Sequence, residues 1–227
     1  MLPWITVDET RTADGTVLRL ARRGTEWEVL FDGSVLMSSR AHGSEDELAR
    51  LAFAKAKHAR TVLIGGLGLG FSLRATLDLL GPRGRVVVAE QSSSVVDWNR
   101  AYVGDLAGRP LEDPRVTVRV GDVRKRIVEA RAAYDLILLD VDNGPDALIH
   151  DANAGLYDAT GIVACHVALK EGGALAVWAV GPDDRYLRRL QRSGFDASAI
   201  RVAPRPGAGG RKHVVFVAVK AVSRGGR

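Results

Sequence analysis

The sequence has very little cysteine, few aromatic residues and no long apolar run. Its 227 residues include one Cys, and only 6% are Phe, Trp or Tyr. The single cysteine, Cys165, excludes an internal disulfide, and no cluster of Cys and His has the spacing of a zinc site. No apolar stretch reaches the roughly 18 residues of a membrane span, and the first residues lack the basic and apolar regions of a secretory signal. We therefore expect a cytoplasmic protein with no membrane partner and no metal.

Acidic residues are missing from the last part of the chain, so positive charge is concentrated there. The chain has 32 Lys and Arg against 27 Asp and Glu, a formal net charge of +5. Residues 201–227 hold seven of these cations and no acid, which leaves a net charge of −2 for the other 200 residues. Phe216 is the only aromatic residue among these cations. So local an excess argues against a nucleic-acid surface.

A small antiparallel unit comes first. Alternating apolar residues predict strands over 16–22, 26–31 and 34–38, and Asp32-Gly33 between the last two is typical of a type I′ hairpin turn. Ser44 and Glu47 have the spacing of a capping box at the start of a helix over about 45–58. The sequence therefore predicts an N-terminal β-hairpin unit over residues 1–50.

The rest of the chain alternates strand and helix patterns. Several strands are continuous apolar runs, such as 136–139, which is typical of parallel strands buried on both faces. The last two strands are joined by residues 204–210, which is too short for a parallel crossover, so that pair should be antiparallel. We predict an α/β, doubly wound, seven-stranded, Rossmann-like catalytic domain over 51–222, followed by a basic tail over 223–227. The expected strands are 61–65, 85–90, 116–120, 136–140, 174–180, 198–202 and 213–219, and the expected helices are 71–80, 93–103, 123–130, 153–169 and 183–193.

A glycine-rich turn follows the first strand of this domain. Gly65, Gly66, Gly68 and Gly70 let the backbone pass close to a ligand at the start of a helix. Phe71 stands where the dinucleotide motif G-x-G-x-x-G requires a small residue, which argues against NAD. The alternative is a tight strand-to-helix turn without a ligand.

The next two strands end in acids that would meet the same crevice. Glu90 ends its strand 24 residues after Gly66, where a carboxylate can accept hydrogen bonds from both ribose hydroxyls of a nucleoside. Gly121 and Asp122 follow the third strand and offer a side chain for an adenine amino group. Asp122 could equally cap the following helix.

The fourth turn carries the candidate catalytic residues. Asp140 ends an apolar strand, so its carboxylate should project into the crevice as a base or cation anchor, with Asp142 as the second candidate. Residues 132–169 contain no Lys or Arg and six Asp, which favours a cationic acceptor such as an amine. The alternative is a solvated loop and helix start. Cys165 and His166 have no catalytic partner at suitable spacing and are interpreted as structural, and His42 as a surface residue near the site.

At these residues the sequence resembles the spermidine synthase family, a branch of the S-adenosylmethionine-dependent methyltransferase fold. The resemblance runs from about residue 30 to about residue 178. Its landmarks are Leu30 to Gly33, Ile64 to Gly66 with Gly70, Glu90, Asp113 to Val116, Gly121-Asp122, Tyr134-Asp135 with Asp140, Gly144-Pro145 and Leu156-Tyr157.

The resemblance implies a transferase that uses S-adenosylmethionine or its decarboxylated form, acts on a small cationic amine and forms a homodimer. It places Glu90 on the ribose, Asp122 at the adenine and Asp140 on the attacking amine. Gly68 stands where the family has an acid that holds the amine of the decarboxylated donor, and Leu36 replaces a usual glutamine. The family's polyamine-site tyrosine has no counterpart in residues 44–51. These departures argue against strict spermidine synthase activity.

Two other functions fit the sequence. One is methyl transfer to a different acceptor, including RNA steered by the basic tail. The other is a nucleoside-binding dimer without turnover. The spacing of residues does not decide whether a methyl or an aminopropyl group would move.

Overall fold

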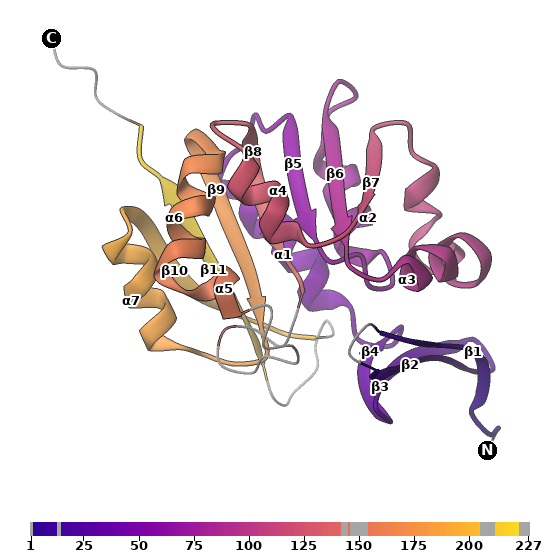
Figure 1. Cartoon of the computed structure of the whole chain (residues 1–227). Helices are drawn as coiled ribbons and strands as arrows, with labels where there is room; N and C mark the ends of the chain where they lie inside the picture. The colour runs from indigo at the N-terminus through magenta and orange to yellow at the C-terminus, as the bar shows by residue number, and fades with distance from the viewer. Residues whose placement is uncertain (1, 13–14, 142–144, 146–153, 205–211, 223–227) are drawn as a thin grey trace, which may run out of the picture.

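The computed structural model describes residues 2–12, 15–141, 145, 154–204 and 212–222, and shows a four-stranded sheet beside a seven-stranded one (Figure 1). The small sheet contains β1 (Ile5–Arg11), β2 (Val17–Arg23), β3 (Glu26–Phe31) and β4 (Ser34–Ser38), in that order. The large sheet has the order β10-β11-β9-β8-β5-β6-β7. Its strands are β5 (Thr61–Gly65), β6 (Arg85–Glu90), β7 (Val116–Val120), β8 (Tyr134–Leu139), β9 (Leu169–Ala179), β10 (Phe195–Val202) and β11 (His213–Lys220). The helices are α1 (Gly43–Lys55), α2 (Phe71–Leu79), α3 (Ser93–Trp98), α4 (Val123–Glu129), α5 (Ala154–Tyr157), α6 (Ala159–Ala168) and α7 (Asp184–Arg192).

The topology of the large sheet confirms the predicted doubly wound fold. Strands β5 to β9 pair in parallel, whereas β11 is antiparallel to β9 and β10 is antiparallel to β11. The parallel strands therefore deliver their carboxyl ends to one edge of the sheet. The small sheet lies on that side of the molecule (Figure 1).

Alternate residues of β8 enter two separate cores. Leu136 and Leu138 pack with α1, α2 and α3, whereas Ile137 and Leu139 pack with α4, α6 and α7, and all four side chains are fully buried. Because successive side chains of a strand point to opposite faces, burying both faces requires the continuous apolar run seen in the sequence. The helices thus fix the sheet from both sides.

The small sheet contains a strand that the sequence patterns did not predict. The residues of β1 are mostly exposed on both faces, with Ile5 64% exposed, so they show no apolar alternation. Pairing with β2 and a 2.7 Å hydrogen bond from Trp98 Nε1 to Asp8 Oδ2 hold β1 in place. The predicted hairpin is present: Asp32 and Gly33 have positive φ values of 46° and 79°.

The predicted capping box at Ser44 and Glu47 is wrong. Helix α1 begins at Gly43 with His42 as its N-cap, so Ser44 already lies inside the first turn. The hydroxyl of Ser44 donates instead to Glu45 Oε2 at 2.6 Å, and Glu47 pairs with Arg50. The Ser44 hydroxyl therefore holds the side chain of Glu45 instead of capping α1.

Three further elements differ from the sequence patterns. The helix expected over 153–169 is two helices, because Asp158 interrupts it and caps α6 by accepting a hydrogen bond from the Gly161 amide. Strand β9 begins at Leu169 rather than 174. Where one helix is expected over 93–103, the structure has α3 followed by a wider π-helical turn over Asn99–Val103.

Candidate active site

The glycine-rich turn after β5 brings the backbone at the end of β5 close to the backbone at the end of β8. Gly66 has a φ of +88°, and a Cβ added there would overlap the carbonyl oxygen of Asp140. Two hydrogen bonds of 2.9 Å hold this approach: Gly66 donates to the Ala89 carbonyl and the Asp140 amide donates to the Gly65 carbonyl. Gly68 and Gly70 also have positive φ, at +53° and +88°. Glycine is therefore required by the backbone here, whether or not a ligand binds.

Glu90 is buried beneath this turn. Its Oε2 accepts a 2.8 Å hydrogen bond from the Leu67 amide, and its Oε1 accepts one of 2.9 Å from the Ser92 amide. Burial raises the pKa of the carboxyl, and the backbone donors oppose that shift. These backbone donors are the amides of Leu67, Ser92, Gln91 and Gly68, so the carboxyl is held by the glycine turn on one side and by the residues after β6 on the other.

The third turn is formed by Gly121 and Asp122. Gly121 has a φ of +134° and donates from its amide to the Glu90 carbonyl at 2.8 Å. Asp122 caps α4, with its Oδ1 accepting from the Arg124 amide at 2.7 Å. The capping role set out as an alternative for Asp122 is present, and its second carboxylate oxygen leaves room for a ligand contact.

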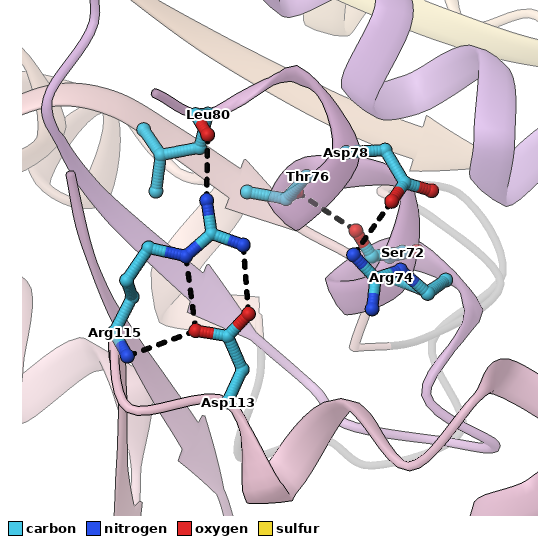
Figure 2. A network of polar contacts seen from close by, with 7 residues as sticks. All are labelled: Ser72, Arg74, Thr76, Asp78, Leu80, Asp113 and Arg115. Atoms are coloured by element: carbon cyan, nitrogen blue, oxygen red, sulfur yellow. Dashed lines mark hydrogen bonds and ion pairs between the residues drawn. The ribbon is translucent and has the colours of Figure 1, made fainter. Parts of the chain in front are cut away.

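Asp140 follows β8 and is held by α2. Ser72 Oγ donates to Asp140 Oδ2 at 2.6 Å, and burial raises the pKa of the Asp140 carboxyl. Ser72 belongs to the first turn of α2, where Thr76 Oγ1 donates back to its carbonyl at 2.8 Å (Figure 2).

The far end of α2 is fixed as well. Arg115 donates to the Leu80 carbonyl at 2.6 Å and forms an ion pair with Asp113 at 2.7 Å (Figure 2). This pair lowers the pKa of Asp113 to about 2. Helix α2 is thus anchored at both ends, which orients Ser72 toward Asp140.

A pocket of about 300 Å³ opens between the two sheets beside Asp140. Most of its wall is apolar, and Asp140 and Glu45 supply the carboxylates. The residues that line it come from β4, α1, the glycine turn, α2 and the ends of β8, β9 and β11: Val35, Leu36, Met37, Ser38, Ala41, Glu45, Leu67, Gly68, Leu69, Phe71, Ser72, Asp140, Val141, Trp178, Val180 and His213. Glu90 is not among them, but Leu67, whose amide it holds, is.

Glu45 is the functional candidate that the sequence analysis missed. Burial and the negative charge of Asp140 raise its pKa to about 8, although the hydrogen bond from Ser44 opposes the shift. Two carboxyl groups that face each other in a desolvated pocket do not both ionise easily near neutral pH. Glu45 resembles an ordinary acid in the first turn of a helix, so only the fold reveals its position.

Other predicted residues fall outside this constellation. Asp142 and most of the acidic stretch after Asp140 lie outside the described residues. Cys165 is buried on the opposite side of the large sheet, and burial raises its pKa to about 12. His166 packs edge-on against Phe195, and His42 stacks on Phe71 with ring centroids 4.1 Å apart.

Two kinds of feature are absent from the part of the chain that the structure describes. Within those residues no helix is long and apolar enough to cross a membrane. No group of three or more His, Cys, Asp or Glu among the same residues is placed to hold a metal ion.

The fold and this edge of the sheet define an α/β protein of the methyltransferase type. A family model for the spermine/spermidine synthase domain matches residues 42–182. The chain therefore belongs to the spermine/spermidine synthase domain family, which confirms the resemblance noted in the sequence.

Individual relatives agree with this assignment. The polyamine aminopropyltransferase of Korarchaeum cryptofilum is 35% identical over 80 residues, 35% of this chain and 24% of that protein. That of Thermoanaerobacter sp. is 30% identical over 128 residues, 56% of this chain and 43% of that protein. The matches thus span between a quarter and a half of these relatives.

Solved structures confirm the fold. A spermidine synthase in complex with the transition-state analogue AdoDATO and the spermidine synthase of Thermotoga maritima each superpose with a TM-score of 0.76 at 17% identity. Each comparison covers 96% of this chain and 73% of the other.

The structure shows what occupies the positions at which the sequence departs from the family. A Cβ on Gly68 would lie 3.2 Å from Met37 Sδ, so a sulfur atom of the small sheet fills the space beside this glycine. Leu36 lines the pocket. The wall of the pocket is therefore more apolar than an acid at 68 and a glutamine at 36 would make it.

Proposed function

We propose that this chain is a spermidine synthase-like transferase that moves the aminopropyl group of decarboxylated S-adenosylmethionine to a small amine. The observation that carries the proposal is the pocket beside the glycine turn, in which Asp140 and Glu45 face a largely apolar cavity. Family membership and the names of the aminopropyltransferase relatives support the reaction type. The volume of about 300 Å³ suits an amine and a propyl chain rather than a macromolecule.

The nucleoside of the donor would bind on the other side of the glycine turn. The carboxylate of Glu90 would accept hydrogen bonds from the ribose hydroxyls, and Gly65, Gly66, Gly68 and Gly70 would let the donor approach the backbone. Gly121 and Asp122 would meet the adenine. The buried Glu90 carboxylate favours this role because charged hydrogen bonds are stronger in a desolvated site.

The reaction needs a neutral amine placed in line with a carbon of the sulfonium donor. The nitrogen lone pair forms the new C–N bond while the C–S bond breaks. The electron pair of the C–S bond remains on sulfur, which becomes a neutral thioether. Asp140 would orient the acceptor and help to remove one proton from its ammonium group, with Asp142 as the second candidate. Holding the two partners in line supplies much of the acceleration in such reactions.

The apolar surroundings of Gly68 bear on which group is transferred. An acid at this position would hold the amine of the decarboxylated donor, and Met37 occupies the space beside Gly68 instead. Methyl transfer from S-adenosylmethionine is therefore the second candidate. In that case the same pocket would hold the acceptor and Asp140 would keep its role.

The test is a transfer assay with two donors. The purified chain is mixed with a panel of small amines that includes putrescine, and with either decarboxylated S-adenosylmethionine or S-adenosylmethionine, and the products are identified by mass spectrometry. We expect an aminopropylated amine and methylthioadenosine. Asp140→Asn should lower the rate at least 100-fold while keeping nucleoside binding. Asp97→Asn is the matched control, because Asp97 is exposed on α3. A methylated product would favour the second candidate, and an unchanged rate in Asp140→Asn would refute the role of Asp140.

A further inference from the structure

We propose that Glu45, Ser44 and His213 form a proton relay that takes the proton released by the acceptor amine away from the carboxyl pair of Glu45 and Asp140. This inference rests on the proposed function, because it concerns the proton that amine transfer must release. The three residues come from α1 and β11, 169 positions apart between Ser44 and His213. The sequence gives no sign that they meet.

The hydrogen bonds form an unbroken chain from the pocket. Ser44 Oγ lies 2.6 Å from Glu45 Oε2 and 2.9 Å from His213 Nδ1. Ser44 is fully buried, so water does not compete for its hydroxyl. Glu45, Asp140 and His213 all line the pocket, and His213 is half-buried at the start of β11.

The hydroxyl of Ser44 allows two arrangements of the same chain. With Glu45 ionised, Ser44 donates to the carboxylate and accepts from the Nδ1–H of His213. With Glu45 protonated, its O–H donates to Ser44, and Ser44 donates to an unprotonated Nδ1. A hydroxyl serves both arrangements because it holds one donor and two acceptor positions. Moving each hydrogen along its own bond converts one arrangement into the other and transfers a proton from Glu45 to His213.

The surroundings give Glu45 the affinity for a proton that this role requires. Burial is the main cause that raises the pKa of Glu45 to about 8, and the negative charges of Asp140, at the end of β8, and of Asp46, its neighbour on α1, add to it. Ser72 stabilises the charge of Asp140 from α2. Glu45 therefore takes a proton near neutral pH more readily than an ordinary glutamate would.

The proton balance of the reaction defines the function of the relay. An ammonium acceptor gives one proton to the Glu45 and Asp140 pair, and its neutral amine then attacks the sulfonium carbon. The C–S bond breaks and the product nitrogen becomes a secondary ammonium. One proton per turnover remains on the carboxyl pair and reduces its negative charge. The next acceptor cation binds to the full negative charge only after that proton has left through Ser44 and His213.

The ionisation of Glu45 is tested first without any substrate. Carbon-13 NMR of labelled glutamate should show Glu45 titrating well above pH 6, and Asp140→Asn should move that titration down. In the same titration the His213 ring signals should respond to Glu45, and Ser44→Ala should remove this response. A Glu45 that titrates below pH 5, or a His213 that is insensitive to it, overturns the relay whether or not the protein transfers any group.

The transfer assay then separates proton transfer from packing. His213→Gln keeps a side chain that can hydrogen bond to Ser44 but does not take up or release a proton near neutral pH. A relay predicts at least a tenfold lower kcat, little change in KM for putrescine, a displaced pH profile, and partial rescue of His213→Ala by added imidazole. His58→Gln is the control, because His58 is exposed and does not line the pocket. A His213→Gln enzyme with the kcat and pH profile of the wild type overturns the relay. Absence of transfer in the wild type, with Glu45 titrating as expected, contradicts the proposed function instead.

Discussion

Replacing Gly66 with alanine should destabilise the protein strongly, because two separate requirements meet at this residue. Its φ of +88° is unfavourable for any L side chain, at about 1–2 kcal/mol. The added Cβ would also overlap the Asp140 carbonyl oxygen and lie 2.9 Å from the carbonyl carbon. Both backbones are tied into the sheet, so neither can move away freely, and such overpacking costs about 1–3 kcal/mol.

The backbone strain and the steric overlap together predict that the free energy of unfolding falls by about 2–5 kcal/mol, compared with a total of about 5–15 kcal/mol for a typical domain. Two matched variants separate them. Gly33 has a φ of +79° but no atom within 4 Å of its added Cβ, so Gly33→Ala should show only the backbone term. Gly81 has neither a positive φ nor a neighbour, so Gly81→Ala should change stability by less than about 1 kcal/mol.

Urea unfolding of the three variants, followed by circular dichroism, measures these differences. The order of destabilisation should be Gly66→Ala, then Gly33→Ala, then Gly81→Ala. A Gly66→Ala variant no less stable than Gly33→Ala would refute the close approach of the glycine turn to Asp140, and with it the geometry of the site.

Three further predictions concern the framework of the site. Cys165 should not react with a thiol reagent at pH 8 in the native state and should react fully in urea, because it is 1% exposed and burial raises its pKa to about 12; rapid native labelling would contradict this. Asp113→Asn should cost about 1 kcal/mol at pH 7. The ion pair with Arg115 lowers the Asp113 pKa to about 2, so this contribution is present above about pH 4 and disappears as the pH falls through about 2; a pH-independent difference in unfolding free energy would argue against it. Leu136→Ala should cost about 2–5 kcal/mol because Leu136 is fully buried in β8, whereas Leu79→Ala, at a side chain 46% exposed, should cost less than about 1 kcal/mol; equal costs would contradict the two-core packing.

The apolar strands were predictable from the sequence because their pattern is local. The run from Leu136 to Leu139 is buried on both faces, and the Asp32-Gly33 turn requires positive φ, so each carries its own signal. Strand β1 was not predictable, because its exposed residues are held by pairing and by one contact with Trp98 rather than by an apolar pattern.

The residues of the site also divide into those that could be placed from the sequence and those that could not. Gly66, Glu90 and Asp140 could be placed from the sequence because each directly follows or ends a strand of the parallel sheet. Glu45 could not be placed, because its role depends on Asp140, Ser44 and the small sheet meeting around one pocket. The capping box at Ser44 was a wrong prediction because α1 begins at Gly43, so Ser44 lies inside the first turn and its hydroxyl contacts Glu45 and His213 instead.

Binding of nucleosides to the wild-type chain tests the central claim most directly. Isothermal titration calorimetry would compare methylthioadenosine with its 2′-deoxy and 3′-deoxy forms and with NAD. If Glu90 holds the ribose, methylthioadenosine binds, NAD does not, and each deoxy form binds about 10–100-fold more weakly, since a charged hydrogen bond contributes about 1.5–3 kcal/mol. Equal binding of the deoxy forms, or a preference for NAD, would contradict the account.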